Sequence, residues 1–205
     1  MNALEPTIYL VDDDKSFLHA MARFLRASGY RVECYASADE FLLRRDPDAA
    51  GCVIADLRMP GTNGFDLQSA LAQTSNPIPV VFLTAHGDIP SSVRAMKRGA
   101  EDFLTKRAPK EDLLEAVRRA LERDDRERAT RSRVAALRRR LDTLTARERQ
   151  VLLEVVQGKL NKQIASDLGI HERTVKLHRT AITGKLAVQS VAQLTRLVQE
   201  AGLLP

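Results

Sequence analysis

Three aspartates directly follow short apolar runs of the sequence, and together they have the chemistry of a cation site. Asp12 and Asp13 follow residues 7–11, and Asp56 follows residues 52–55. Both runs combine β-branched, aromatic and small apolar residues, as buried strands do. A lone aspartate at the end of a strand more often caps the next helix. The three can act together only if the fold makes their strands neighbours.

The first 122 residues alternate between short apolar runs and segments with helical periodicity. We expect five strands, at residues 7–11, 31–35, 52–55, 79–83 and 101–104. Helices are expected near residues 17–28, after 37, at 64–71, at 90–99 and from 111 onward. Strand–helix–strand crossovers are right-handed, so this alternation predicts a parallel sheet with helices on both faces. The fold class indicated is α/β, of the flavodoxin-like (βα)5 type.

In the flavodoxin-like strand order 2-1-3-4-5, the strands that end at Asp12 and Asp56 are neighbours. Carboxylates in one crevice raise each other's pKa unless a cation relieves the repulsion. Mg²⁺ binds carboxylates, carbonyl oxygens and waters, and it brings phosphate oxygens to such a site. Thr84 and Lys106 end the fourth and fifth strands on the same rim. Their hydroxyl and ammonium groups could bind a phosphoryl group.

Charge is distributed unevenly along the 205 residues. The net charge is −3 over residues 1–122, +4 over 123–142 and +4 over 143–205, which gives the chain its +5. An acidic front suggests a part that binds cations, and a basic rear suggests a part that meets a polyanion. Two cysteines in unrelated runs, no membrane-length apolar run and no signal peptide predict a cytoplasmic protein without a membrane partner.

Residues 123–142 are predicted to form a helical linker that continues the preceding helix. Acidic and basic residues stand four apart, acid first, which favours a solvated helix. A short heptad seam follows at Val134, Leu137, Leu141 and Leu144. Two interpretations stay open: packing against its own domain, or helical coupling in a dimer, although coiled coils usually need more heptads.

Residues 143–205 show four short segments of helical periodicity, which predicts a small all-α domain. Two of them are joined by Gly169 and Ile170, and the second is basic, as in a helix-turn-helix. The second helix of that motif enters the major groove of DNA. Lys176, Arg179 and Thr180 would face outward from it, toward bases or phosphates. Lys162, at the start of the first helix, fits a phosphate contact.

The front of the chain resembles the receiver domain of two-component response regulators. The motifs are Val-Asp-Asp-Asp at 11–14, Asp-Leu-Arg-Met-Pro-Gly-x-x-Gly at 56–64, Leu-Thr-Ala at 83–85 and Gly-Ala-x-x-Phe-Leu-x-Lys at 99–106. The resemblance implies that Asp56 is the phosphoacceptor. It implies that Mg²⁺ (or Mn²⁺) is bound by Asp12, Asp13, Asp56 and the carbonyl of Arg58. It further implies a phosphate-binding Lys106, a switch hydroxyl on Thr84 and a switch aromatic at Phe103.

One position departs from the receiver pattern. Receivers usually carry proline after the lysine, whereas Arg107 stands here. A cis peptide bond before a non-proline residue costs about 3 kcal/mol. The loop is therefore expected either to be trans with a different shape, or to be strained.

The rear resembles the LuxR-type (GerE-like) output domain. The matching residues are Leu144-Thr145-x-Arg147-Glu148-x-x-Val151-Leu152, Gly158, Asn161-Lys162-x-Ile164-Ala165, Leu168-Gly169-Ile170, Thr174-Val175-Lys176-x-His178-Arg179 and Lys185-Leu186. By this resemblance Lys176, Leu177 and Thr180 face bases. Lys162, Thr174 and Arg179 would contact the DNA backbone.

Together the two halves resemble a response regulator of the FixJ/NarL type, with a receiver at 1–122, a linker at 123–142 and a helix-turn-helix domain at 143–205. That class implies phosphorylation of Asp56 by a sensor histidine kinase, homodimerisation through the fourth helix, fifth strand and fifth helix, and control of transcription on double-stranded DNA. It also implies that the protein is not an enzyme and only assists the receiver's own phosphorylation and dephosphorylation. Two rivals stay open: a regulator that ignores phosphorylation, and a haloacid-dehalogenase-like phosphatase. Arg58 argues against the phosphatase, which needs a second aspartate there.

Overall fold

The computed structural model describes residues 5–85 and 87–202, and the predicted domain ends at 1–4 and 203–205 lie outside them. The chain divides into two compact units, Met1–Arg128 and Ala129–Pro205. None of the described helices is long and apolar enough to cross a membrane. Each unit is considered by itself below.

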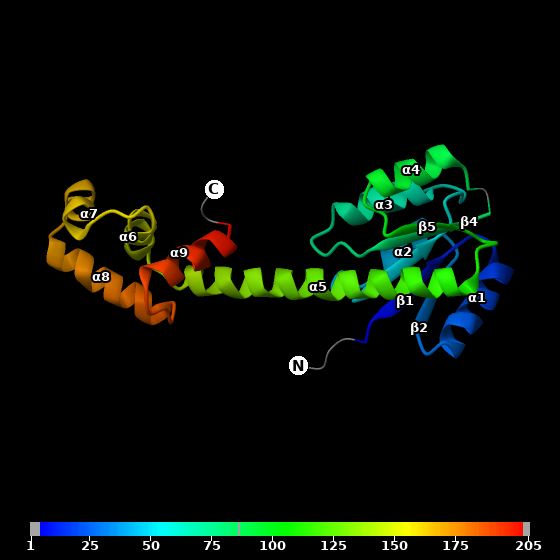
Figure 1. The fold of residues 1–205 in the computed structure, drawn as a ribbon, viewed down its shortest axis with the longest axis horizontal. Helices are drawn as coiled ribbons and strands as arrows, with labels where there is room; N and C mark the ends of the chain where they lie inside the picture. Colours follow the sequence, from blue (N-terminus) through cyan, green and yellow to red (C-terminus); the bar gives the residue numbers. More distant parts are fainter. Residues whose placement is uncertain (1–4, 86, 203–205) are drawn as a thin grey trace. The chain divides into compact units, whose positions relative to one another are not determined.

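The first unit is a five-stranded parallel sheet with helices on both faces (Figure 1). Its strands are β1 (Thr7–Val11), β2 (Arg31–Tyr35), β3 (Gly51–Ala55), β4 (Val80–Thr84) and β5 (Asp102–Thr105). Its helices are α1 (Lys15–Ala27), α2 (Ala38–Arg44), α3 (Gly64–Ala72), α4 (Ile89–Lys97) and the first part of α5 (Lys110–Asp142). The strand order β2-β1-β3-β4-β5 confirms the flavodoxin-like prediction. β4 and β5 each begin one residue later than predicted.

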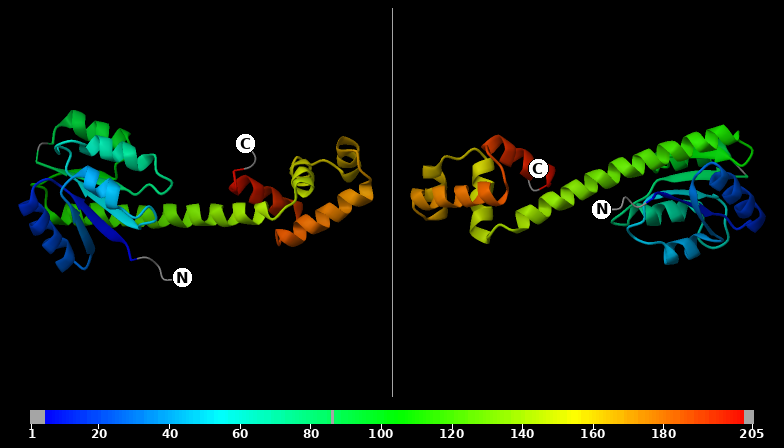
Figure 2. Two further views of the ribbon diagram at one scale, coloured as in Figure 1. Left: turned by 180° about the vertical axis from the view of Figure 1, so that it is seen from behind. Right: turned by 90° about the horizontal axis from the view of Figure 1, so that it is seen from below.

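Two apolar layers enclose the sheet, and Figure 2 shows the helices on either side of it. Phe41, Leu67, Leu71 and Ala95 bring α2, α3 and α4 onto one face. On the other face α1 and α5 pack through the buried side chains Leu18, Ala22, Leu25, Leu113, Ala116, Val117 and Ala120. The strands that lie between these layers are buried along their whole length in β1, β3 and β4, as central parallel strands are.

Helix α5 is continuous over 33 residues, so the predicted linker helix is the second half of one element. The first residues of that linker are hydrogen-bonded to the first unit. The Asp124 carboxylate accepts from the Gly51 amide at 2.9 Å. Arg128 donates to the carbonyls of Asp48 and Ala49 at 2.8 and 3.0 Å. Gly51 (φ +140°) is required here, because an added Cβ would lie 1.8 Å from the carbonyl oxygen of Thr7.

The short apolar seam of the linker packs within its own unit. Leu141 and Leu144 are buried in the core of the second unit, and Leu137 packs against the same cluster. Val134 is half-exposed. Of the two open interpretations, packing against its own domain therefore holds for the seam residues Leu137, Leu141 and Leu144.

Among the described residues of the second unit, up to Gly202, four short helices follow α5: α6 (Ala146–Val156), α7 (Asn161–Leu168), α8 (Glu172–Lys185) and α9 (Val191–Glu200). Thr145 and Glu148 form the capping box that starts α6. Gly169 ends α7 in the left-handed conformation (φ +63°), which favours glycine and lets the chain turn into α8. Val151, Ile164, Val175 and Ile182 join these helices in one core. The predicted all-α helix-turn-helix domain is confirmed.

Candidate functional site

The three predicted acidic residues meet at the carboxyl edge of the sheet. β1 and β3 are hydrogen-bonded neighbours, with Val11 opposite Ala55, so the residues after them lie side by side. One carboxylate oxygen from each of Asp12, Asp13 and Asp56 lies within 4.8 Å of the others. Asp12 and Asp56 are buried, and Asp13 is exposed. The three aspartates that were predicted to lie close together therefore do so in the fold.

Backbone amides fix one oxygen of each buried carboxylate. Asp12 Oδ1 accepts from the Asp14 amide at 3.0 Å, and Asp56 Oδ1 accepts from the Leu57 amide at 2.7 Å. Asp14 itself caps α1 by accepting from the amides of Ser16 and Phe17. These turns orient both carboxylates, and their Oδ2 atoms both face Lys106.

Lys106 lies between the two buried aspartates. Its Nζ atom is 2.5 Å from Asp12 Oδ2 and 3.4 Å from Asp56 Oδ2. Its backbone amide donates to the Thr84 carbonyl at 2.8 Å, which anchors the end of β5 to β4. One ammonium group therefore faces two buried carboxylates, so the cluster keeps an excess of negative charge.

Burial and neighbouring charges act in opposite directions on the pKa values of Asp12 and Lys106. Burial raises the pKa of Asp12 above its ordinary value, although the hydrogen bond and charge of Lys106 act in the opposite direction. Burial lowers the pKa of Lys106, but its bond to Asp12 and the charges of Asp12 and Asp56 outweigh that effect, and the pKa is raised. Asp12 is thus a carboxylate that its surroundings do not fully compensate.

This donor set fits a hard divalent cation. Carboxylate oxygens are the ligands that Mg²⁺ prefers, and two of them here are buried and preoriented. Asp13 and Arg58 lie on the exposed side, where they line a cleft of about 600 Å³ with Leu57, Met59, Pro60, Asn63, Phe65, Ser91 and Arg94. The cation site would therefore be open to solvent on that side.

The predicted switch residues lie on the two adjacent strands. Thr84 ends β4 and is 1 % exposed. Phe103 on β5 is half-buried, and its ring centroid is 6.2 Å from that of Phe82. The Phe103 ring also lies beside Gly87, where an added Cβ would be 3.3 Å from it. Phe103 thus borders the segment that joins β4 to α4.

The loop at Arg107 follows the first of its two expected forms. No peptide bond among the described residues is cis, so the bond between Lys106 and Arg107 is trans. A turn closes there, with the Ala108 amide donating to the Thr105 carbonyl at 2.9 Å. The Arg107 side chain is exposed.

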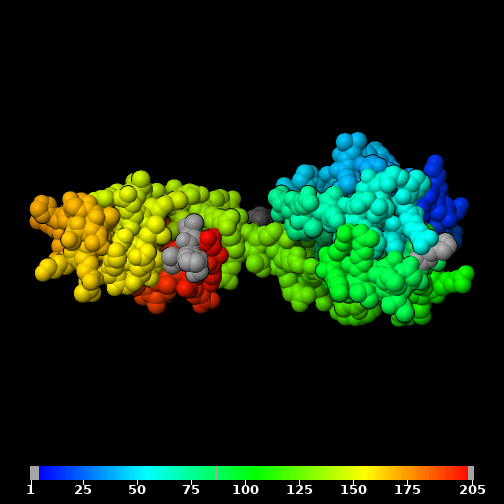
Figure 3. Space-filling view, turned by 90° about the horizontal axis from the view of Figure 1, so that it is seen from above, coloured from blue at the N-terminus to red at the C-terminus, as the bar shows by residue number. Residues whose placement is uncertain are grey.

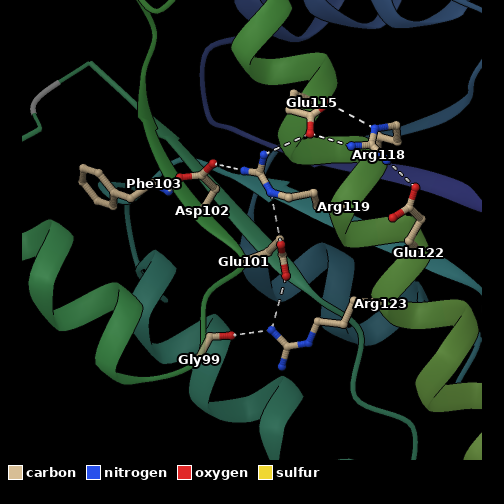
Figure 4. A network of polar contacts seen from close by, with 9 residues as sticks. All are labelled: Gly99, Glu101, Asp102, Phe103, Glu115, Arg118, Arg119, Glu122 and Arg123. Carbon is tan, nitrogen blue, oxygen red and sulfur yellow. Dashed lines mark hydrogen bonds and ion pairs between the residues drawn. The ribbon is translucent and has the colours of Figure 1, made fainter.

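Next to Phe103, β5 is bound to α5 by a network of ion pairs (Figure 4). Arg119 lies 2.5 Å from Asp102 and 3.5 Å from Glu101. Arg123 donates to the Gly99 carbonyl at 3.2 Å and lies 3.5 Å from Glu101. The Asp102 side chain points toward α5, whereas the Phe103 ring points away from it. Neighbouring residues of β5 therefore contact α5 and the segment before α4.

In the second unit, the predicted DNA-contacting residues lie on α7 and α8. Lys162, Lys176, Leu177 and Thr180 are exposed, and Thr174 and Arg179 are half-buried. Leu177 is an exposed apolar side chain at 65 %. Arg179 donates to the Asn161 side chain at 2.8 Å, a bond that joins α8 to the start of α7.

Comparison with known proteins accounts for both units. Residues 8–118 match the response regulator receiver domain, and residues 142–198 match the bacterial regulatory proteins of the luxR family. The chain belongs to the two-component response regulators with a LuxR-type DNA-binding domain. It is 44 % identical over 199 residues to the response regulator protein TmoT of Ectopseudomonas mendocina, covering 97 % of this chain and 90 % of the relative.

Two further relatives extend the likeness over nearly the whole chain. The transcriptional regulatory protein FixJ of Rhizobium meliloti is 39 % identical over 201 residues, covering 97 % of this chain and 98 % of its own. The solved structure of response regulator StyR superposes with a TM-score of 0.82 at 45 % identity, covering 96 % of this chain and 99 % of its own. The expected FixJ/NarL-type organisation is confirmed.

Three kinds of contact at these sites have no clear signal in the sequence. Phe17, whose ring lies under Lys106, was indistinguishable from a core residue in an apolar helical stripe. Asn161 stands in the LuxR-type motif, but the motif gives no signal for its hydrogen bond with Arg179. The Arg119 and Arg123 ion pairs join residues that are many positions apart, and charged residues on a helix carry no signal for a partner on another element.

Proposed function

We propose that Asp56 accepts a phosphoryl group from the phosphohistidine of a sensor histidine kinase. An oxygen of Asp56 attacks phosphorus and the N–P bond breaks. The leaving histidine nitrogen keeps the bonding pair and takes up a proton. The observation that carries the proposal is the position of Lys106, within 3.4 Å of Asp56 and 2.5 Å of Asp12. A buried carboxylate, a second carboxylate and an ammonium group are the parts that phosphoryl transfer requires.

Asp12, Asp13, Asp56 and the carbonyl of Arg58 would hold Mg²⁺ or Mn²⁺. The support is the set of oxygen donors, three of them within 4.8 Å of one another. When bound, the cation neutralises the charge on the carboxylates and on the incoming phosphoryl oxygens. Lys106 would then donate to a phosphoryl oxygen, because an ammonium group has three N–H donors. The buried hydroxyl of Thr84 would donate to another.

The switch would act on the face formed by α4, β5 and α5. Phe103 borders the segment before α4, and its neighbour Asp102 is bound by Arg119 of α5. A movement of Thr84 and Phe103 toward the phosphoryl group would therefore shift contacts on both sides of β5. α5 continues into the predicted linker, so the change would be carried along one element.

A second copy of the chain would cover α4. Ile89, Val93 and Met96 stand at helical spacing and are 79 %, 46 % and 48 % exposed, a stripe of apolar side chains on one helix. Figure 3 looks onto the first unit from the side of α4, whose green surface faces the viewer. Burial of this stripe in a homodimer would supply the apolar part of an interface.

The output would be DNA binding through α8. Lys176, Leu177 and Thr180 are exposed on it and would meet base edges in the major groove. Lys162, Thr174 and Arg179 would contact the phosphates. A dimer would present two such helices to two half-sites about one helical turn apart. The protein would act in the cytoplasm, where its DNA target and the kinase domain are found, and it would catalyse nothing beyond its own phosphorylation and dephosphorylation.

The experiment is incubation with acetyl phosphate and Mg²⁺, followed by phosphate-affinity electrophoresis and size-exclusion chromatography. The wild type is expected to show a retarded band and a dimer, and Asp56→Asn neither. A wild type that shows neither change, yet binds its DNA normally, would establish the alternative of a regulator that ignores phosphorylation. Turnover of a phosphomonoester would instead support a phosphatase.

A further inference from the structure

The ammonium group of Lys106 has a third neighbour besides the two aspartates. Its Nζ atom lies 4.2 Å from the centroid of the Phe17 ring on α1. At that distance the negative face of the ring attracts the ammonium charge. The Lys106 side chain is only 16 % exposed, so the attraction acts in a site largely shielded from water.

Phe17 does not belong to the buried stripe of α1. That stripe consists of Leu18, Ala22 and Leu25, which are 6 % exposed or less. Phe17 is half-buried and packs at the edge of this core. Its position is fixed because the Asp14 cap accepts from the Phe17 amide at 3.1 Å. The turn that orients Asp12 therefore also places the ring.

An aromatic ring at this position acts on the Lys106 ammonium group differently from a further carboxylate. It attracts the ammonium group without accepting its N–H bonds, so these remain available to oxygen atoms. The peptide bond between Lys106 and Arg107 is trans, so no cis bond shapes the backbone beside the lysine. A flexible four-carbon stem needs side-chain neighbours to fix its end.

We propose that Phe17 is a positioning residue for Lys106: its ring keeps the ammonium group between Asp12 and Asp56, where the phosphoryl oxygens arrive. The proposal rests on the proposed role of Asp56 as phosphoacceptor. Phe17 acts only through Lys106, and it touches neither phosphoryl group nor cation.

The chain offers a matched control on the same helix. Phe24 lies two turns after Phe17, and its ring is 4.9 Å from Nζ of Lys110. Phe24 is also partly buried against the same core. Lys110 is exposed at the start of α5 and faces none of the three aspartates in an ion pair among the described residues. Phe24→Leu therefore removes an equivalent ring away from the site.

The test measures the rate of phosphorylation by acetyl phosphate with Mg²⁺ in the full chain. Phe17→Leu is expected to lower this rate about 3- to 10-fold, and Phe17→Tyr to restore it to within about twofold. Phe24→Leu is expected to match the wild type. In a Lys106→Ala background, Phe17→Leu is expected to cost nothing more, because its effect passes through the lysine.

Equal losses for Phe17→Leu with and without Lys106 would overturn the proposal, as would a wild-type rate in Phe17→Leu. If Phe17→Leu does not fold by circular dichroism, Phe17→Met, which fills the space without a ring, is measured against the same predictions. A wild type that accepts no phosphoryl group would instead overturn the proposed function itself, so the two failures are distinguishable.

Discussion

Each unit of this protein contains a lysine paired with a buried carboxylate, and the two pairs differ in how completely they are compensated. Lys185 lies 2.7 Å from Glu148, whose carboxylate also accepts from the Thr145 amide at 2.7 Å. The hydrogen bond from Lys185, followed by that from the Thr145 backbone, lowers the pKa of Glu148. Burial raises the pKa of Asp12 in spite of Lys106.

The difference agrees with a structural role for the Glu148 pair and with the functional role proposed for the Lys106 pair. Glu148 closes the capping box of α6, and every contact around it favours the charged carboxylate. At the Lys106 site one ammonium group serves two buried carboxylates, and Asp13 adds a third nearby. Under the proposed function, a bound divalent cation would relieve this excess of negative charge. Functional sites commonly carry such unfavourable terms.

The largest predicted effect comes from replacing the carboxylate of each lysine–carboxylate pair by the corresponding amide. Asp12→Asn is expected to lower the Mg²⁺-dependent phosphorylation rate at least about 100-fold, since a bound metal contributes several kcal/mol. In metal-free protein the same change should raise the free energy of unfolding by about 1 kcal/mol. Glu148→Gln should lower the free energy of unfolding and leave phosphorylation intact. Urea unfolding and acetyl phosphate kinetics measure both; loss of stability in metal-free Asp12→Asn would break the comparison.

Dimerisation is the next effect in size. Val93→Glu places a charge in the apolar stripe of α4 and should weaken the phosphorylated dimer at least about 10-fold, because an unpaired charge in an interface is costly. Leu43→Glu is the matched control, since Leu43 is an exposed leucine of α2, at 86 %. Analytical ultracentrifugation measures the dissociation constants. Equal dimerisation of Val93→Glu and wild type would place the interface elsewhere.

In the second unit, base contacts and phosphate contacts should respond differently. Lys176→Ala is expected to cost about 1–3 kcal/mol on specific DNA and to relax the sequence preference. Lys162→Ala should weaken binding to all sequences alike and reduce the salt slope by about one. Fluorescence anisotropy at several salt concentrations separates the two. If Lys176→Ala weakened specific and random DNA equally, Lys176 would be a phosphate contact.

The sequence was sufficient for the architecture and for the residues at strand ends. Asp12 and Asp56 follow apolar runs, and parallel topology alone brings such positions to one edge. The spacing of Leu137, Leu141 and Leu144 predicted an apolar seam. It could not show whether the seam packs against its own domain or against a second copy of the chain, because both arrangements require the same periodicity. The hydrogen bonds of Arg128 to the carbonyls of Asp48 and Ala49 could not be predicted, since a charged helical run looks the same whether solvated or bonded to a distant loop.

The smallest predicted effect sharpens the structural side of the comparison. Thr145→Ala removes the side-chain cap of α6 and is expected to lower the free energy of unfolding by about 1 kcal/mol, with no change in phosphorylation.

Glu148 makes the stability of the second unit dependent on pH. Because the folded-state pKa of Glu148 is lowered, its contribution to stability is present above its ordinary pKa of 4.5 and is lost as the pH falls through the folded-state pKa. Hydrogen exchange of the α6 amides should show this acid-induced loss in the wild type. Its persistence in Glu148→Gln would contradict the assignment to Glu148.

The most direct test locates the phosphoryl group itself. An acyl phosphate on an aspartate is reduced by borohydride to homoserine, so the modified residue is found by peptide mass spectrometry after reaction with acetyl phosphate and Mg²⁺. We expect homoserine at position 56 in the wild type, and none at any position in Asp56→Asn. A wild type without homoserine, or with homoserine at another aspartate, would contradict the account of the Asp12, Asp56 and Lys106 cluster as the phosphoacceptor site.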